Sequence, residues 1–341
     1  MKRLVLVGAG RAHLAVLRAL GAKPLPGAHV TVVSPQAAQV HAGMLPGLIA
    51  GHYFLEDATI DVAGLAARAH AEFVEGAVQA LDLERRRLRL ADGRELAYDV
   101  ASLNAVAAVD AALPGAELAL PVKPVERLLR ELGRPRHLAL VGGGEAGAEL
   151  AMALRHAGVH VTLFAEAFAG ARLARALRRR GVDYRPGMTV DAIEPGPVVR
   201  SGASRQAFER VLLAGGPAAP GWLRAAGLAA DARGFVLVER TLRSRSHPEV
   251  FAAGDCAVVH EAPQKSSAPP GRQGEVLEAN LRAVVAGGPL AATVTSRRAL
   301  SLVTCGARYA VASWDGWSAE GRWAWWWKDR MDRRWIRSLA G

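Results

Sequence analysis

The sequence predicts an α/β fold with two Rossmann-like dinucleotide-binding domains and a C-terminal segment of strands and helix. Three observations support this prediction. A buried-strand pattern, a glycine-rich turn and an alanine-rich helix follow one another twice, in residues 3–20 and in residues 138–156. Each helix precedes a second apolar run, at residues 29–33 and 159–164, as a parallel strand–helix–strand unit requires. A chain of 341 residues is long enough for two such domains.

The central unit has the features of a dinucleotide-binding turn. Gly142 permits the tight turn, Gly144 lets the backbone approach a pyrophosphate, and Gly147 lets the helix pack closely on the strand. The helix N-terminus offers N–H groups and the positive end of its dipole to phosphates. Glu166 follows the second strand and can bind a ribose hydroxyl. We therefore expect these four residues to bind a dinucleotide.

The N-terminal unit repeats this plan with two changes. Gly8 and Gly10 form the turn, but His13 stands where a third glycine is expected. Ser34 stands where a ribose-binding carboxylate is expected. One glycine turn is weak evidence, whereas two in one chain indicate duplicated units with two facing nucleotide sites. These four residues are the expected cofactor contacts of the first unit.

A loop at residues 39–47 follows the first unit. Its glycines and proline suit close approach of the backbone to a flat ligand, and Gly43, Met44 and Leu45 are its expected cofactor contacts. His41 in the same loop is interpreted as an ordinary surface histidine.

Further along the chain, alternating leucines on both sides of a turn at residues 91–93 predict one hairpin over residues 79–104. A proline-rich connection then places a domain boundary near residues 110–125. The second unit continues with a basic helix and two strands, which are expected at residues 171–180, 189–193 and 210–214.

Composition and charge narrow the class of protein. Lysine and arginine number 43 against 32 acidic residues, which suits an anionic cofactor or an anionic membrane surface; nucleic acid is set aside because its binding motifs are missing. No apolar stretch is long enough to span a bilayer. Cys256 and Cys305 have no metal-ligand spacing, so no metal site is expected and a reducing cytoplasm fits best. The start of the chain leads directly into a strand, so no signal peptide is expected.

A later strand ends in Gly254 and Asp255, just before a stretch that favours helix. With the two glycine turns, this pair resembles the two-dinucleotide flavoproteins of the disulfide-reductase superfamily. In that superfamily the pair holds the ribityl chain and pyrophosphate of FAD, and the chain returns to complete the FAD domain. The resemblance implies a first FAD part, an NAD(P)H domain, a second FAD part and a C-terminal segment at residues 1–112, 113–232, 233–290 and 291–341.

Within that superfamily, the chain is most similar to type II NADH dehydrogenases, and above all to the module joined to selenide, water dikinase. The stretches that carry the similarity are residues 7–13, 43–52, 121–125, 142–149, 272–274, 300–309 and 325–334. The resemblance implies FAD in the first unit and NAD(P)H in the second, with hydride passing from the nicotinamide to the flavin. Disulfide reductases are excluded, because their reaction needs a vicinal cysteine pair.

The resemblance also implies roles for individual side chains. Glu149 matches a glutamate near the nicotinamide and the acceptor, although a helix-surface glutamate explains its spacing equally well. Gln273 matches a glutamine near the flavin and the quinone. Lys265 could place positive charge beside a reduced flavin, with an ordinary solvated lysine as the alternative. Lys123, in a shared stretch, is expected to contact the cofactor.

Three departures from the family leave open whether flavin chemistry is altered or lost. Residues 104–108 replace a glycine-containing turn. Residues 268–271 bring two prolines to an apolar wall beside the flavin. Ser34 gives no acidic anchor for a ribose.

The C-terminal segment holds seven of the eight tryptophans, interleaved with basic residues. At helical spacing one stripe collects Trp323, Trp327, Met331, Trp335 and Leu339. Such a helix suits an anionic membrane interface, as in type II dehydrogenases. A helix packed on the FAD domain is the alternative, and both could hold.

The leading hypothesis is an FAD-dependent dehydrogenase that passes electrons from NADH to a quinone-like acceptor, cytoplasmic or peripheral on the inner membrane face. The alternatives are a reductase of a selenium or sulfur compound and a non-catalytic nucleotide-binding protein. Glu166 favours NADH, because a carboxylate repels a 2′-phosphate, while Arg172 and Arg175 leave NADPH open. A homodimer is also left open.

Overall fold

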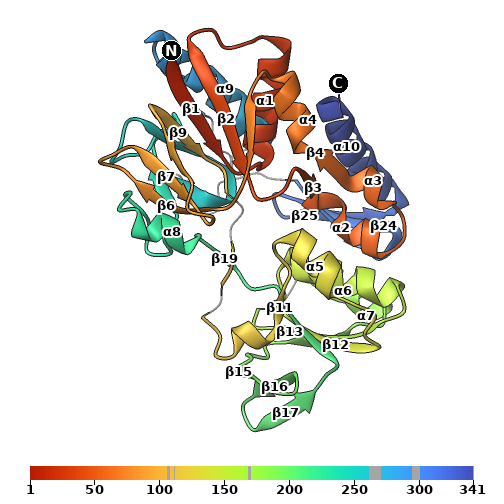
Figure 1. The fold of residues 1–341 in the computed structure, drawn as a ribbon. Helices are drawn as coiled ribbons and strands as arrows, with labels where there is room; N and C mark the ends of the chain where they lie inside the picture. The colour runs from red at the N-terminus through yellow and green to blue at the C-terminus, as the bar shows by residue number, and fades with distance from the viewer. Residues whose placement is uncertain (106–107, 111, 168–169, 261–269, 294–299, 341) are drawn as a thin grey trace.

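The structure is a computed structural model that describes residues 1–341 except 106–107, 111, 168–169, 261–269, 294–299 and 341 (Figure 1). The described chain forms two lobes, each built on a parallel sheet, and a C-terminal segment that contacts both. The predicted fold class, two Rossmann-like units with a C-terminal sheet and helix, is confirmed.

The first lobe contains a parallel sheet whose five described strands run in the order β21-β9-β1-β2-β5. Their bounds are β1 (Lys2–Val7), β2 (Ala28–Ser34), β5 (Glu72–Glu75), β9 (Val100–Leu103) and β21 (Val250–Ala252). Strand β1 is central, and its Leu4 pairs with Val30 on one side and Val100 on the other. Because β21 comes after the second lobe in the sequence, the chain returns to complete the first sheet.

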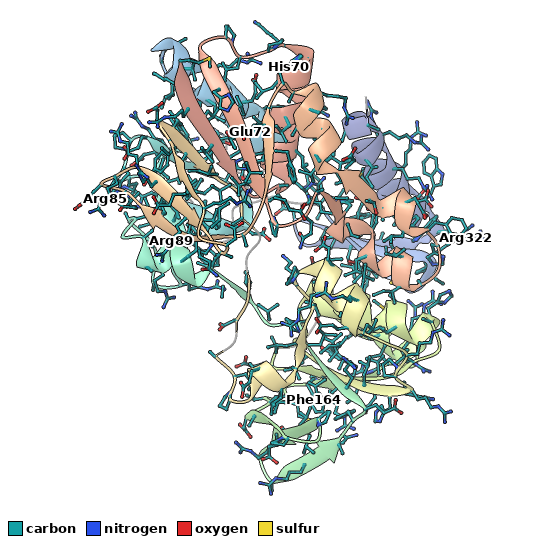
Figure 2. All side chains as sticks on the ribbon, in the orientation of Figure 1. His70, Glu72, Arg85, Arg89, Phe164 and Arg322 are labelled. Carbon is teal, nitrogen blue, oxygen red and sulfur yellow. The ribbon has the colours of Figure 1, made fainter. Side chains whose placement is uncertain are left out.

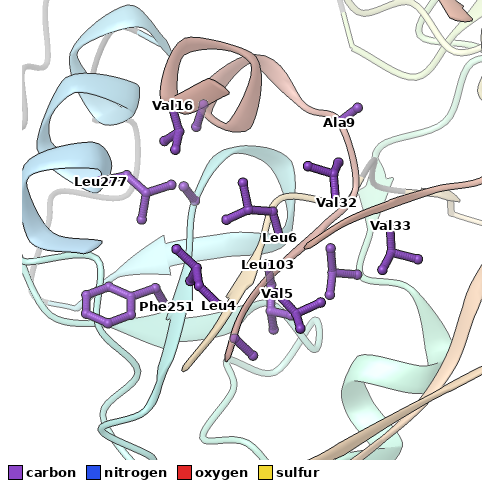
Figure 3. Packing of buried hydrophobic residues seen from close by; sticks show 14 of the residues in the cluster. Leu4, Val5, Leu6, Ala9, Val16, Val32, Val33, Leu103, Phe251 and Leu277 are labelled. Carbon is purple, nitrogen blue, oxygen red and sulfur yellow. The ribbon is translucent and has the colours of Figure 1, made fainter. Parts of the chain in front are cut away.

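Both faces of this sheet are covered, so the apolar side chains of β1, which alternate between the two faces, are buried on both. Helices α1 (Arg11–Ala22) and α9 (Pro270–Ala286) pack together on one face, where Val16 and Leu277 lie on the same side of β1 as Leu6 (Figure 3). An antiparallel sheet shares the same core from the other side, and its strands are β6 (Val78–Asp82), β7 (Arg87–Leu90) and β8 (Glu95–Ala97).

The single hairpin predicted over residues 79–104 is wrong in one respect. The turn at residues 91–93 does join two antiparallel strands, β7 and β8. The chain beyond residue 97, however, leaves the hairpin and enters the parallel sheet as β9. All four residues of β9 are buried, as expected for a central strand whose two faces are covered and not for a hairpin strand with one solvent-exposed face.

The second lobe repeats the plan of the first. Its parallel sheet has the order β11-β18-β12-β13-β14, with strands β11 (Leu120–Pro121), β12 (His137–Val141), β13 (His160–Ala165), β14 (Asp183–Pro186) and β18 (Arg210–Leu213). Its helices are α5 (Val125–Glu131), α6 (Glu145–His156) and α7 (Ala171–Arg179), and its antiparallel strands are β15 (Ala192–Glu194), β16 (Val198–Ser201) and β17 (Ser204–Ala207). Phe164, labelled inside this lobe in Figure 2, stacks edge-on against Phe208.

Two connections join the lobes as a short antiparallel pair, β10 (Ala108–Val109) and β19 (Pro217–Ala218) (Figure 1). The C-terminal segment consists of β23 (Ser301–Cys305), β24 (Ala307–Trp314), β25 (Trp317–Gly321) and α10 (Arg322–Ala340). Strand β23 packs on α6, so Val303 belongs to the core of the second lobe. Helix α10 packs on α1 and on β4 (Thr59–Asp61) of the first lobe.

Short elements complete the described chain. They are β3 (Ala38–Val40), a 3-10 turn (Ala42–Met44), α2 (Leu45–Ile49), α3 (Leu55–Ala58), β4 (Thr59–Asp61), α4 (Val62–Arg68), a 3-10 turn (Ala116–Leu118), α8 (Gly221–Ala225), β20 (Val236–Val238), a 3-10 turn (Gly254–Cys256) and β22 (Ala257–Val259). Within the described ranges, none of the helices has the length and apolar character needed to cross a lipid bilayer.

Candidate cofactor and redox site

A cavity of about 1300 Å³ opens at the carboxyl end of the first sheet, where ligands bind in open α/β sheets. This volume exceeds the range of about 300 to 1000 Å³ of pockets for small ligands, so an extended ligand fits. Its wall includes residues 7–12, 33–36, 39–43, 76–78, 104–105 and 254–255.

The first glycine turn is shaped by a close approach to Asn104. Gly8 has a φ of +86°, and a Cβ there would lie 2.7 Å from the carbonyl oxygen of Asn104. A Cβ on Gly10 would lie 2.3 Å from Oδ1 of Asn104, and one on Gly254 would lie 2.4 Å from its Nδ2. These contacts are shorter than real Cβ atoms show, so all three positions around the backbone and carboxamide of Asn104 require glycine.

Asn104 directly follows β9 and connects it to α1 and to the end of β21 at the cavity. Its Oδ1 accepts hydrogen bonds from the backbone N–H groups of Ala12 (3.1 Å) and His13 (3.2 Å) in the first turn of α1. Its Nδ2 donates to the carbonyl of Ala253 at 2.7 Å, at the end of β21. In the sequence this position stands out only as the start of residues 104–108, which replace a glycine-containing turn of the family. An amide residue that ends a strand beside a glycine turn is the signal that could have identified it as a helix cap.

His13 lies beneath the turn, not in the cavity wall. It is fully buried, its Nδ1 lies 2.7 Å from the carbonyl of Gly8, and its Nε2 lies 2.8 Å from Oγ of Ser102. Burial lowers the pKa of His13 to about 4, although the bond to Gly8 opposes this shift. The neutral ring therefore supports the turn from inside the core.

Several of the residues predicted to bind the cofactor come together at the cavity. Lys123 Nζ and Asp255 Oδ2, whose residues both line the cavity, form an ion pair of 2.9 Å. Gln273 also lines the cavity, and its Oε1 accepts a hydrogen bond from the backbone of Gly254 at 2.8 Å. Lys265 lies outside the described residues.

The remaining contacts predicted for the first unit divide into two groups. Ser34 and Gly43 line the cavity. Met44 and Leu45 are buried and do not belong to its wall; Leu45 packs in the core of the second lobe.

The second glycine turn lies in the other lobe and has an open side. A Cβ on Gly142 would lie 2.2 Å from the carbonyl of Ala214, and one on Gly147 would lie 2.0 Å from the carbonyl of Gly142. Gly144, which caps α6, would meet nothing within 4 Å. The open side at this helix N-terminus is a cradle that a phosphate group can enter. Glu166 is exposed just after β13.

Glu149 on α6 is not a helix-surface residue. It is partly buried beneath β23, and its Oε1 accepts a hydrogen bond from the backbone N–H of Thr304 at 2.7 Å. Burial raises the pKa of Glu149 above its ordinary value, while Lys328 and the Thr304 donors oppose this shift. The carboxyl group thus favours its protonated form more than a surface glutamate does, which suits a group that transfers protons.

His41 is not the surface histidine that the sequence suggested. It is buried, and its Nε2 lies 3.2 Å from Oδ1 of Asp332 on α10. Asp332 also pairs with Lys328 at 2.7 Å, and Lys328 donates to the carbonyl of Gly43. No pattern in the sequence indicates this role for Lys328 or Asp332, because 291 positions separate His41 from Asp332 and no periodicity links them.

Comparison with known proteins decides the family. Residues 2–275 match the family model described as pyridine nucleotide-disulphide oxidoreductase. The chain belongs to this family. It is an FAD-dependent NAD(P)H oxidoreductase.

The names of similar proteins indicate different electron acceptors. The chain is 32% identical over 284 residues, 74% of its length and 67% of the relative, to the ferredoxin–NAD(+) reductase component of the biphenyl dioxygenase system of Paraburkholderia xenovorans. The sulfide:quinone oxidoreductase of Aquifex aeolicus superposes with a TM-score of 0.78 at 17% identity, over 99% of this chain and 91% of that one. An engineered water-forming NADPH oxidase bound to NADPH gives 0.75 at 19%, over 91% and 74%. At these identities the two structures show the fold alone.

The first cavity of this oxidoreductase fits FAD. Its volume and extended wall suit a dinucleotide, the glycine turn brings the N-terminus of α1 to one side, and Asp255 faces the same space. The flavin supplies the chemistry when bound, because it accepts hydride from a reduced nicotinamide and passes electrons onward.

The two cysteines do not form a redox pair in this oxidoreductase. Both are free and buried; Cys256 belongs to the core of the first lobe and Cys305 to that of the second. Burial raises the pKa of Cys256 to about 12 and that of Cys305 to about 11. Thiols with such pKa values are poor nucleophiles near neutral pH, which agrees with the exclusion of disulfide-reductase chemistry.

Proposed function

We propose that the protein transfers hydride from NADH to FAD and passes the electrons to a quinone-like acceptor at a membrane surface. The observation that carries this proposal is the position of α10. Its inner face contacts the cavity wall at His41 and Gly43 through Asp332 and Lys328, while its outer face exposes tryptophans.

The outer face of α10 has the composition of a membrane-interface helix. Trp323, Trp326, Trp327 and Met331 are 47%, 58%, 42% and 49% exposed, and Arg330 lies over the ring of Trp326. Arg322 points outward at the start of the same helix in Figure 2. Tryptophan rings favour the depth of lipid headgroups, and arginines favour anionic lipid. A helix that carries both on its exposed face suits peripheral binding.

In this proposal the residues of the first lobe hold FAD. The turn at Gly8 and Gly10 receives the pyrophosphate, and Asp255 accepts hydrogen bonds from the ribityl hydroxyls. Lys123, between β11 and α5 of the second lobe, is close enough to Asp255 to hold its carboxylate in place and to add a positive charge to the cavity wall. Gln273 fixes the backbone of Gly254 through its hydrogen bond.

The residues of the second lobe hold NADH. The open side of Gly144 receives the pyrophosphate, with Gly142 and Gly147 shaping the turn. Glu166, exposed after β13, binds the ribose hydroxyls and disfavours the 2′-phosphate of NADPH. Glu149 delivers the proton that accompanies reduction of the acceptor, because burial raises its pKa above the ordinary value, against the opposing charge of Lys328.

A second candidate acceptor is a small ferredoxin-type protein. The 32% identical relative is named as a ferredoxin–NAD(+) reductase component, and the net charge of +11 suits an acidic partner. The two candidates differ in what should reoxidise the flavin.

The test is a two-step anaerobic experiment on the purified protein. NADH should bleach the flavin absorbance, and a menaquinone analogue should then restore it faster than a ferredoxin or polysulfide does. Faster reoxidation by the ferredoxin would favour the second candidate, and faster reoxidation by polysulfide would favour reduction of a sulfur compound. A preparation without flavin, or one that NADH does not bleach, would contradict the proposal.

A further inference from the structure

The inward face of α10 is unusually polar for a helix that packs on a protein core. Lys328 and Asp332 lie one turn apart on this face, with side chains only 15% and 13% exposed. One turn further on, Trp335 packs against the core of the first lobe and lies beneath the guanidinium groups of Arg11 and Arg18. Buried ionic pairs therefore help to hold this helix in place, together with its buried apolar side chains.

Asp332 is the centre of these buried pairs. Its Oδ1 accepts a hydrogen bond from Nε2 of His41 at 3.2 Å, and its Oδ2 lies 2.7 Å from Nζ of Lys328. Burial alone would raise the pKa of Asp332, but the bond from His41 and the charge of Lys328 outweigh it and lower the pKa to about 2. Glu149 and Arg11 also feel the charge of this carboxylate. Asp332 is therefore ionised and fully engaged near neutral pH.

Both partners of Asp332 act on the wall of the cofactor cavity. His41 is itself part of that wall, and its backbone N–H donates to the carbonyl of Ala58 at 2.7 Å. Lys328 donates to the backbone carbonyl of Gly43, two residues further along the same wall. One carboxylate on the C-terminal helix thus fixes two points of a loop near the N-terminus.

We propose that Asp332 is a positioning residue of the flavin site, which holds the wall segment from His41 to Gly43 and neutralises the Lys328 ammonium beside it. The C-terminal helix then completes the cofactor cavity and is more than a docking appendage. This inference rests on the assignment of FAD to the cavity, but it does not depend on which acceptor the enzyme uses.

The consequence for the flavin follows from charge. In Asp332→Asn one amide oxygen replaces the two carboxylate oxygens, so it cannot accept from both His41 and Lys328. Lys328 also loses its counterion, and the wall segment is held less firmly. An uncompensated ammonium beside the cavity favours the anionic, reduced flavin and raises the midpoint potential. Removal of the ammonium instead leaves the carboxylate unopposed, which lowers the midpoint potential.

The test compares Asp332→Asn with Asp329→Asn in the full chain. Asp329 lies on the same helix, pairs with Arg333 at 3.0 Å and is similarly buried at 17% exposure, but it has no contact with the cavity wall among its described bonds. FAD is removed and titrated back, and the dissociation constant is read from flavin fluorescence. Asp332→Asn should weaken FAD binding by about tenfold, whereas Asp329→Asn should change it by less than about twofold.

The midpoint potential of the bound flavin gives a second readout that a merely structural role would not move in a fixed direction. The potential should rise in Asp332→Asn, fall in Lys328→Met and stay unchanged in Asp329→Asn. If Asp332→Asn does not fold, the Lys328→Met shift still tests the charge argument. The proposal is overturned if Asp332→Asn and Asp329→Asn weaken FAD binding equally, or if the potential shifts of Asp332→Asn and Lys328→Met have the same sign. Neither measurement involves an electron acceptor, so their failure is distinct from failure of the quinone assignment.

Discussion

The side-chain oxygen of Asn104 lies 3.2 Å from the backbone nitrogen of His13, although 91 positions separate the two residues in the chain. This bond, with its neighbour to Ala12, satisfies N–H groups in the first turn of α1 from inside the protein. Asn104, which is distant in the sequence, therefore caps α1, a role that the side chain of the N-cap residue has in most helices. Residue 10 has to be glycine, because a Cβ there would overlap the Asn104 side chain.

The two glycine turns should respond differently to the same substitution. Gly10 and Gly144 both cap a helix with nearly identical dihedral angles, −63° and 167° against −62° and 172°. Gly10→Ala should lower the free energy of unfolding by about 2 kcal/mol, because its methyl group overlaps Asn104. Gly144→Ala should change it by less than about 0.5 kcal/mol, yet raise the KM for NADH at least about tenfold by filling the cradle.

Urea unfolding and steady-state kinetics together check this pair. Because the backbone conformations match, each variant is the control for the other. Equal losses of stability, or an unchanged KM for NADH in Gly144→Ala, would contradict the roles assigned to the two turns.

Acid should destabilise the protein through His13. The pKa of His13 is about 4 when folded, below the value of about 6.5 in the unfolded chain, so the unfolded state binds the proton more tightly. The stability that His13 contributes is complete above pH 6.5 and is lost as the pH falls toward 4, by about 3 kcal/mol at most. Urea unfolding at pH 7.5, 5.5 and 4.5 measures this slope.

His13→Asn should be less stable at pH 7.5 but should show a shallower slope between pH 6.5 and 4. His70→Asn is the control, since His70 is exposed on the surface (Figure 2) and its replacement should keep the wild-type slope. A His13→Asn slope as steep as that of the wild type would show that other groups cause the acid sensitivity.

Glu149→Gln should separate the two halves of the reaction. Glutamine still accepts the hydrogen bond from Thr304 but cannot release a proton. We expect normal FAD content, normal flavin reduction by NADH, and reoxidation by a quinone slowed about 100-fold. Stopped-flow absorbance resolves both steps. Glu145→Gln, on the exposed first turn of α6, should leave both rates within about twofold, and unchanged reoxidation in Glu149→Gln would remove this residue from proton transfer.

The exposed tryptophans of α10 should govern binding to anionic vesicles. Replacement of Trp326 and Trp327 by alanine removes two rings from the outer face and should reduce co-sedimentation with phosphatidylglycerol vesicles at least about tenfold. Leu118→Ala, an exposed apolar residue of the second lobe, is the matched control and should bind as the wild type does. Failure of the wild type to sediment, or equal binding by the double variant, would contradict membrane docking.

The fold class could be predicted because its signals are local. Glycine turns, apolar runs of strand length and an alanine-rich helix lie within about 30 residues of one another. The error at β9 arose where a central strand directly follows an antiparallel one, since both read as apolar runs until burial on two faces is known.

The arrangement around the site could be predicted only in part, because it depends on contacts between distant segments. The stripe from Trp323 to Leu339 was expected to form one face, but its first half is exposed whereas Leu339 is buried against the first lobe. The stripe does lie on one face of α10, but this face meets solvent in the first half of the helix and the first lobe in the second half. The caps and pairs made by Asn104 and Asp332 leave no periodic trace in the sequence, and the roles proposed for the cofactor-binding residues remain predictions.

The short antiparallel pair of β10 and β19 joins the lobes through two residue pairs, so rotation of one lobe against the other would disrupt few of its hydrogen bonds. Residues 301–340 form a further connection that packs on both lobes, through β23 on α6 of the second and through α10 on α1 of the first. The C-terminal segment, far from either glycine turn in the sequence, therefore helps to fix how the two lobes sit against each other. Rotation of the lobes against each other would first have to break the contacts of β23 with α6 or those of α10 with α1.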